Sequence, residues 1–194
     1  MVALPKLPDY MTVAGFLAWS PPDGRRWQLV DGVVQAMAPP GRTHGVLQGE
    51  VARRIGNHLR ARGGPCVLVV TPGVLPRIAS GQNLRIPDLA VTCAPDHEEE
   101  AVLTDPALVI ELLSPSNHAQ TWANVWAYAT IPGVREILIL ATTTIAADLL
   151  RRRDDGTWPE QPIHLDQGEL VLDSIGFSVD LASLYATTRL ARGV

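Results

Sequence analysis

One short run, ALVIELL at 107–113, constrains the fold more than any other feature of the sequence. Every residue in it except Glu111 is apolar, and it has the length of a strand, which predicts a central strand covered on both faces. Such a strand needs packed layers on both sides of its sheet. A carboxylate at this position costs several kcal/mol unless it is paired, hydrogen-bonded or bound to a cation. Glu111 is therefore the first candidate functional residue.

The remaining hydrophobic patterns supply the layers that such a strand requires. They alternate between helical and strand periodicity, and their mixed order predicts an α/β fold, a central mixed β-sheet flanked by helices. No internal repeat or linker divides the chain, so we expect 1–194 to form a single domain with 1–10 as a mobile N-terminal segment. The predicted elements are a helix (11–20), a hairpin (26–40), a helix (44–62), three strands (66–70, 84–93 and 107–113), a helix (119–131), two strands (134–140 and 144–158) and a final strand and helix (169–185).

Composition limits the classes of protein that fit. The chain has 194 residues, 46% of them hydrophobic and 19% charged, as in an ordinary globular protein. Its net charge of −4 argues against a protein that coats nucleic acid, although a local basic groove is compatible with it. The N-terminus lacks the apolar run of a signal peptide, and no stretch approaches the ~20 apolar residues of a membrane span. We therefore expect a cytoplasmic protein that makes no membrane contact.

The two cysteines are expected to be free. Cys66 and Cys93 are too few and too far apart in the sequence to indicate a disulfide framework or a zinc motif. Each has apolar neighbours, which predicts small buried side chains. A reducing cytosol fits this interpretation best.

A second acid has surroundings like those of Glu111. Asp88 lies in LRIPDLAVTC (84–93), another apolar strand pattern. Neighbouring strands lie about 4.8 Å apart, so a carboxylate from each could meet at one end of the sheet. Two close carboxylates repel unless a hard divalent cation such as Mg²⁺ or Mn²⁺ lies between them. The alternative is structural: Glu111 could form a buried ion pair with Arg85 or Arg135.

Several longer stretches resemble one family. In order along the chain they are WQLVDGVVQAMAPPGRTHG (27–45), RIPDLAV (85–91), LVIELLSPSN (108–117) and AYATIPGVREILIL (127–140). Together they resemble the bacterial Uma-two family, which is placed in the PD-(D/E)XK nuclease superfamily. The resemblance implies a restriction-endonuclease-like core, a divalent metal (Mg²⁺ or Mn²⁺) and hydrolysis of DNA phosphodiester bonds.

The same resemblance implies roles for individual residues. Asp88 and Glu111 would be the metal ligands, with the backbone carbonyl of Leu112 as a further ligand. His44, at the start of a helix, would be the third catalytic residue, and Gln28 would line the pocket. A histidine at a helix start could otherwise be an ordinary surface residue near the helix cap.

The sequence departs from the family pattern at the basic residue of the site. A lysine usually lies two residues after the glutamate, where this chain has Leu113, or four before the helical tyrosine, where it has Asn124. The only lysine is Lys6, in the N-terminal segment. A glutamate of the opening hairpin is replaced by Gln28, so one charged group of each sign has become a neutral amide.

Three further residues could line the site. Arg85 lies three residues before Asp88, so a regular strand would point it to the opposite face unless a bulge near Pro87 turns it. Gln120 and Asn124 are four apart on a predicted helix and share a face, either as site residues or as a solvated surface. His118 is a more distant candidate.

The sequence thus predicts a metal-dependent DNA endonuclease with an atypical site, whose expected partners are DNA and a second copy in a homodimer. One alternative is a catalytically inactive nuclease-fold protein that binds nucleic acid or a protein partner; the missing lysine favours it. Another is a structural protein whose two acids pair with arginines, and that alternative predicts no metal binding.

Overall fold

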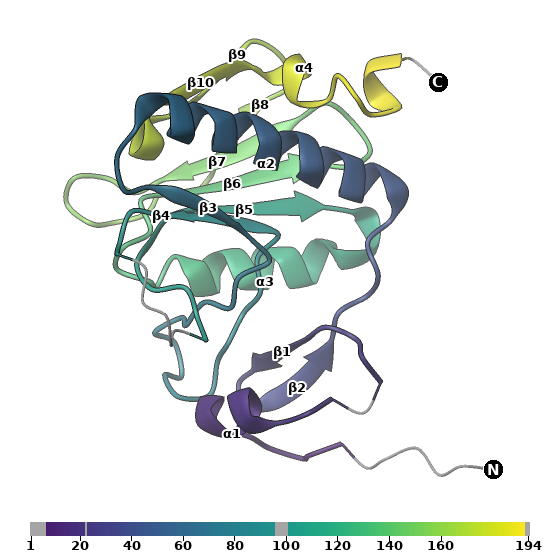
Figure 1. Cartoon of the computed structure of the whole chain (residues 1–194), viewed down its shortest axis with the longest axis vertical. Helices are drawn as coiled ribbons and strands as arrows, with labels where there is room; N and C mark the ends of the chain where they lie inside the picture. The colour runs from purple at the N-terminus through teal and green to yellow at the C-terminus, as the bar shows by residue number, and fades with distance from the viewer. Residues whose placement is uncertain (1–6, 22, 96–100, 193–194) are drawn as a thin grey trace.

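The computed structural model describes residues 7–21, 23–95 and 101–192. The mobile segment expected at 1–10 therefore lies partly outside the described residues, and Lys6 lies wholly outside them. Figure 1 shows a sheet between two long helices, with a small hairpin below it and the C-terminal elements above.

A six-stranded mixed sheet forms the centre of the protein. Its strand order is β3-β4-β5-β6-β7-β8, and all neighbours are antiparallel except the parallel pair β5 and β6. The predicted ALVIELL strand is confirmed as an inner strand with neighbours on both sides. The strands are β3 (Val67–Val70), β4 (Leu89–Thr92), β5 (Pro106–Leu113), β6 (Glu136–Ala141), β7 (Ala147–Arg151) and β8 (Ile163–Leu165).

One long helix covers each face of the sheet (Figure 1). Helix α2 (Arg42–Arg62) buries a stripe of apolar side chains against one face, formed by Leu47, Val51, Ile55 and Leu59. Helix α3 (His118–Tyr128) packs on the other face, after a 3₁₀ turn, η1 (Pro115–Asn117). The α/β fold with a central mixed sheet flanked by helices is therefore confirmed. Helix α2 begins at Arg42, two residues before the predicted start at 44, and its N-cap is Gly41.

A small hairpin forms a two-stranded sheet of its own. Strands β1 (Trp27–Val30) and β2 (Val33–Ala36) pair around the predicted turn at Asp31 and Gly32, both with positive φ. A Cβ at Gly32 would collide with the ring of Tyr10, so glycine is needed there. Helix α1 (Val13–Ala18) confirms the short helix predicted before the hairpin.

The C-terminal region differs from its prediction. Instead of one strand and a helix, it contains a hairpin of β9 (Glu169–Leu172) and β10 (Phe177–Asp180), followed by helix α4 (Leu181–Leu184). Short 3₁₀ turns, η2 (Asp173–Ile175) and η3 (Leu190–Arg192), complete it. The second strand was missed because Gly176, with φ 59°, reverses the chain within an otherwise continuous apolar pattern.

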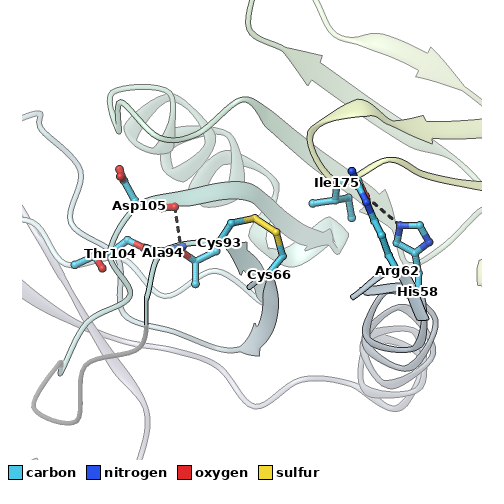
Figure 2. The surroundings of a disulfide bond; sticks show 9 residues. His58, Arg62, Cys66, Cys93, Ala94, Thr104, Asp105 and Ile175 are labelled. Carbon is cyan, nitrogen blue, oxygen red and sulfur yellow. Dashed lines mark hydrogen bonds between the residues drawn. A yellow bond between two sulfur atoms is a disulfide. The ribbon is translucent and has the colours of Figure 1, made fainter. Parts of the chain in front are cut away.

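The prediction of free, buried cysteines was wrong. Cys66 and Cys93 are half-buried and form a disulfide with a Cα–Cα distance of 3.9 Å (Figure 2). The antiparallel register of β3 and β4 pairs Val67 with Thr92, so the two cysteines lie opposite each other at the next position. Because 27 residues separate them in sequence, only the strand pairing reveals this contact.

The disulfide removes one support for the predicted cytoplasmic location, because such bonds are rare in a reducing cytosol. Among the described helices none is both long and apolar enough to cross a membrane. The homodimer stays a prediction.

Candidate metal centre

The two candidate carboxylates lie on adjacent antiparallel chain segments. Strands β4 and β5 pair Leu89 with Ile110, so continuing the register by one residue places Asp88 opposite Glu111. The backbone N–H of Leu112 donates to Asp88 Oδ2 at 2.8 Å and fixes that carboxylate at the end of the sheet. The arrangement meets the requirement of the metal-site hypothesis, which sequence alone left open.

Side chains of helix α2 also contact Asp88. His44 Nε2 lies 3.2 Å from Asp88 Oδ1, and Gln48 Nε2 donates to the Asp88 backbone carbonyl at 2.9 Å. The N–H of Thr71, just after β3, donates to the same carbonyl at 2.9 Å. Sequence reasoning missed Gln48. Its signal was the four-residue spacing from His44, which puts both side chains on one helical face.

Glu111 is buried, and no arginine forms an ion pair with it in the described part of the chain. Tyr128 on α3 donates its hydroxyl to Glu111 Oε1 at 2.7 Å. Burial, and secondly the nearby charge of Asp88, raise the pKa of Glu111 well above its usual value. Burial also raises the pKa of Tyr128, so this hydroxyl stays protonated and acts as a donor. In the sequence, Tyr128 served only to locate position 124 within the family pattern, and its contact with Glu111 was not predicted.

The structural alternative of an arginine ion pair does not hold for the described side chains. Arg135 is exposed. Arg85 is buried, and its Nη1 donates to Asn124 Oδ1 at 3.2 Å. Residue 85 forms an isolated bridge with Val74 and precedes β4, so the alternation of a regular strand does not decide which way its side chain points.

Three other predicted residues have different surroundings. Gln120 Nε2 donates to Asn124 Oδ1 at 3.1 Å, so these two side chains share a face as expected. Gln28 is buried in β1, and its Oε1 has no hydrogen-bond partner within the described structure. His118 is exposed and lies against Trp122, with ring centroids 6.5 Å apart, so nothing ties it to the carboxylates.

The donors present suit a hard cation better than a soft one. Across the described ranges, no group of three or more His, Cys, Asp or Glu side chains is arranged to hold a metal ion, as a structural zinc site would require. Magnesium needs only one or two carboxylates and keeps several waters. Asp88 and Glu111 provide that number, and the His44 ring whose Nε2 contacts Asp88 has a buried Nδ1 with no hydrogen-bond partner in the described part of the chain.

Comparison with known proteins agrees with this architecture. Residues 13–183 match the sequence model of the Uma-two family, described as "Putative restriction endonuclease". The chain belongs to this family. A relative from Synechocystis sp., "Uncharacterized protein slr1290", is 30% identical over 172 residues, which cover 88% of each chain.

A solved structure supports the fold independently. The crystal structure of a "putative nuclease" from Anabaena variabilis superimposes with a TM-score of 0.73, covering 91% of this chain and 98% of that one. At 16% identity it is evidence for the fold alone. The resemblance of the sequence to the Uma-two family and the expected nuclease-like architecture are therefore confirmed.

Proposed function

We propose that this Uma-two protein is a Mg²⁺- or Mn²⁺-dependent endonuclease that hydrolyses phosphodiester bonds in DNA. The observation that carries the proposal is the pair of Asp88 and Glu111, brought face to face by strand register while Glu111 is buried and has no cationic partner among the described residues. Asp88, Glu111 and the Leu112 carbonyl would hold the ion. A divalent cation at this place supplies Lewis-acid polarisation of a phosphate and activates water.

The protein's own side chains fix the two carboxylates. His44 and the Leu112 N–H each engage one oxygen of Asp88, which leaves each oxygen a second lone pair for a ligand. The Tyr128 hydroxyl donates a hydrogen bond to Glu111 Oε1 and not to Oε2. Because these donors come from α2, β5 and α3, the carboxylates are held by three separate elements before any ligand binds.

Titration of the native protein with Mn²⁺ tests the proposal. We expect binding heat from the native protein, and none from the Asp88→Asn, Glu111→Gln double variant, because both carboxylate ligands are gone. The matched control, Asp148→Asn with Glu169→Gln, removes two acids outside this centre and should bind as the native protein does. Absence of binding by the native protein, with and without DNA, would contradict a metal-dependent activity.

A basic pocket supports DNA as the substrate of this acidic protein. The start of α2 and the C-terminal segment enclose a pocket of about 330 Å³ whose lining includes Arg42, Arg189 and Arg192. None of the three pairs with an acidic side chain in the described part of the chain. Thr43 accepts a hydrogen bond from Arg189 Nε at 3.2 Å, which leaves the Nη groups available for phosphate oxygens.

Replacing two of these arginines should weaken DNA binding and make it less sensitive to salt. For Arg42→Gln with Arg192→Gln, we expect the slope of log affinity against log salt to fall by about one for each phosphate that the protein no longer neutralises. Fluorescence anisotropy with a labelled duplex at several NaCl concentrations measures it. Arg153→Gln, another exposed arginine, is the control. Equal slopes for the double variant and the native protein would exclude the pocket from the DNA interface.

A binding role without catalysis is the second candidate function. It is favoured by the absence of a basic side chain at both Leu113 and Asn124. Such a protein would bind Mn²⁺ and DNA and leave a panel of supercoiled, linear and single-stranded DNAs intact. Cleavage by the native protein that disappears in the Asp88→Asn, Glu111→Gln variant would exclude this candidate.

A further inference from the structure

Arg85 is a buried cation with no acidic partner among the described side chains. The residue is 4% exposed, and within the described structure its side chain makes one hydrogen bond, from Nη1 to Asn124 Oδ1 at 3.2 Å. Its Nε is buried and has no acceptor among the described residues. Burial lowers the pKa of the guanidinium below its usual value, although arginine stays charged at neutral pH. A buried charge without an ion-pair partner is expensive, and the nearby Asp31 carboxylate offsets only part of that cost.

Asn124 links this cation to the metal centre. Its Oδ1 accepts hydrogen bonds from both Arg85 Nη1 and Gln120 Nε2. These two donors fix which end of the amide is the oxygen, so the NH₂ group must face elsewhere. Asn124 also lies one helical turn before Tyr128, whose hydroxyl donates to Glu111 Oε1, so the amide shares the face of α3 that meets this carboxylate. The order is therefore guanidinium, amide, carboxylate.

We propose that Asn124 and Arg85 together replace the lysine that is absent from this site. Asn124 presents N–H donors at the carboxylate end of the centre, and Arg85 supplies positive charge from behind the amide. Arg85 acts through Asn124 and is a positioning residue, whereas Asn124 reaches the centre itself. The inference rests on the proposed nuclease function and gives a physical reason why position 124 can be neutral.

The Asn124 amide and the Arg85 guanidinium supply different parts of what a lysine would provide. Negative charge that develops on a phosphate is stabilised by nearby donors and by any cation within the same low-dielectric region. A lysine provides the donor and the charge in one ammonium group. Here the amide provides the donor, and the guanidinium, which does not release its proton, provides a fixed field.

Arginine variants at position 85 separate charge from packing. Arg85→Gln can keep a donor to Asn124 Oδ1 but removes the charge, and Arg85→Met removes both. Arg135→Met, which removes an exposed arginine, is the matched control. We expect both Arg85 variants to bind Mn²⁺ about tenfold more tightly, since one cation no longer repels another. We also expect kcat to fall by about 100-fold with KM for DNA little changed.

The decisive test is rescue by a lysine at position 124. In the Arg85→Met background, Asn124→Lys places an ammonium where the family has one, and kcat should return to within about tenfold of the native value. Asn124→Lys alone puts two cations together and should weaken Mn²⁺ binding. A merely structural role for Arg85 would not be restored by a charge on a different element.

The outcomes distinguish this inference from the proposed function. If the native protein binds Mn²⁺ and cleaves DNA but Arg85→Gln and Arg85→Met match Arg135→Met in both measurements, the inference alone is overturned. The Arg85→Met, Asn124→Lys variant gives a second test. If it folds, as shown by its circular dichroism and thermal transition, and its kcat stays low, the lysine-replacement role is also overturned. If the native protein neither binds Mn²⁺ nor cleaves DNA, both proposals fall.

Discussion

Glu111→Gln is expected to stabilise the metal-free protein at pH 8 by on the order of 2 kcal/mol, because it removes a buried charge that has no ion-pair partner among the described residues. The replacement is close to isosteric. Its amide oxygen can still accept the hydrogen bond from Tyr128, and its NH₂ can donate to Asp88, which lies opposite. Stabilisation on replacement of a buried carboxylate would mark Glu111 as a residue kept for function.

The effect has a definite pH dependence. The folded-state pKa of Glu111 is raised above its unfolded value, so the folded protein binds this proton more tightly. Below the unfolded pKa, about 4.3, the group is neutral in both states and carries no penalty. As the pH rises through the folded pKa, the native protein loses stability and Glu111→Gln does not. The difference between the two should therefore be small at pH 4 and largest at pH 8.

Urea denaturation in EDTA at pH 4, 6 and 8 measures this difference. Glu136→Gln is the matched control, because Glu136 is also buried, on the next strand, β6. Glu136 instead pairs with Arg151 at 2.7 Å and accepts the N–H of Ser174 at 2.8 Å. Its replacement should destabilise the protein by about 3 kcal/mol at pH 8. Destabilisation of similar size in both variants would show that Glu111 is already compensated in the folded protein.

Added Mn²⁺ should reverse the order of stability of the native protein and Glu111→Gln. An ion that binds only the folded state stabilises it by about 2.7 kcal/mol at 100 times its Kd. The native protein should gain this stabilisation, while the variant, which lacks one ligand, should gain little. An equal gain in both proteins would place the binding site elsewhere.

The fold could be predicted where local pattern and burial agree. Strand β5 was clear because an unbroken apolar run fits only an inner strand, and α2 because Leu47, Val51, Ile55 and Leu59 recur at helical spacing. The β9–β10 hairpin was missed because its reversal at Gly176 falls between two apolar segments that look continuous in sequence.

Only part of the candidate site could be predicted from the sequence in the same way. Asp88 and Glu111 stood out because a charge in an apolar run is anomalous wherever the strands lie. Gln48, Tyr128 and the contact between Arg85 and Asn124 depend on how α2, α3 and the segment before β4 are packed, which periodicity does not encode. For Arg85, strand alternation could not settle the direction of the side chain, because residue 85 precedes β4 and forms an isolated bridge with Val74.

Reduction of the disulfide between Cys66 and Cys93 is expected to lower the free energy of unfolding by about 3.5 kcal/mol, the loop-entropy value for a loop of this size. The bond closes a loop across 27 residues and joins edge strand β3 to β4. Urea denaturation with and without dithiothreitol measures the change. The Cys66→Ser, Cys93→Ser variant should have the stability of the reduced protein, and dithiothreitol should not change it. An unfolding midpoint of the native protein that does not change on reduction would show that the loop is not closed in solution.

The same bond should also affect the metal centre, because β3 leads directly to a contact with Asp88. Just after β3, the Thr71 N–H donates to the Asp88 carbonyl, and β4 begins at the following residue, Leu89. An edge strand paired on one side only is among the first to open locally, and the disulfide anchors its far end. We therefore expect reduction to weaken Mn²⁺ binding several-fold by loosening one of the hydrogen bonds that hold Asp88. Unchanged Mn²⁺ affinity in the reduced protein would show that His44, Gln48 and the Leu112 N–H hold this residue without help from β3.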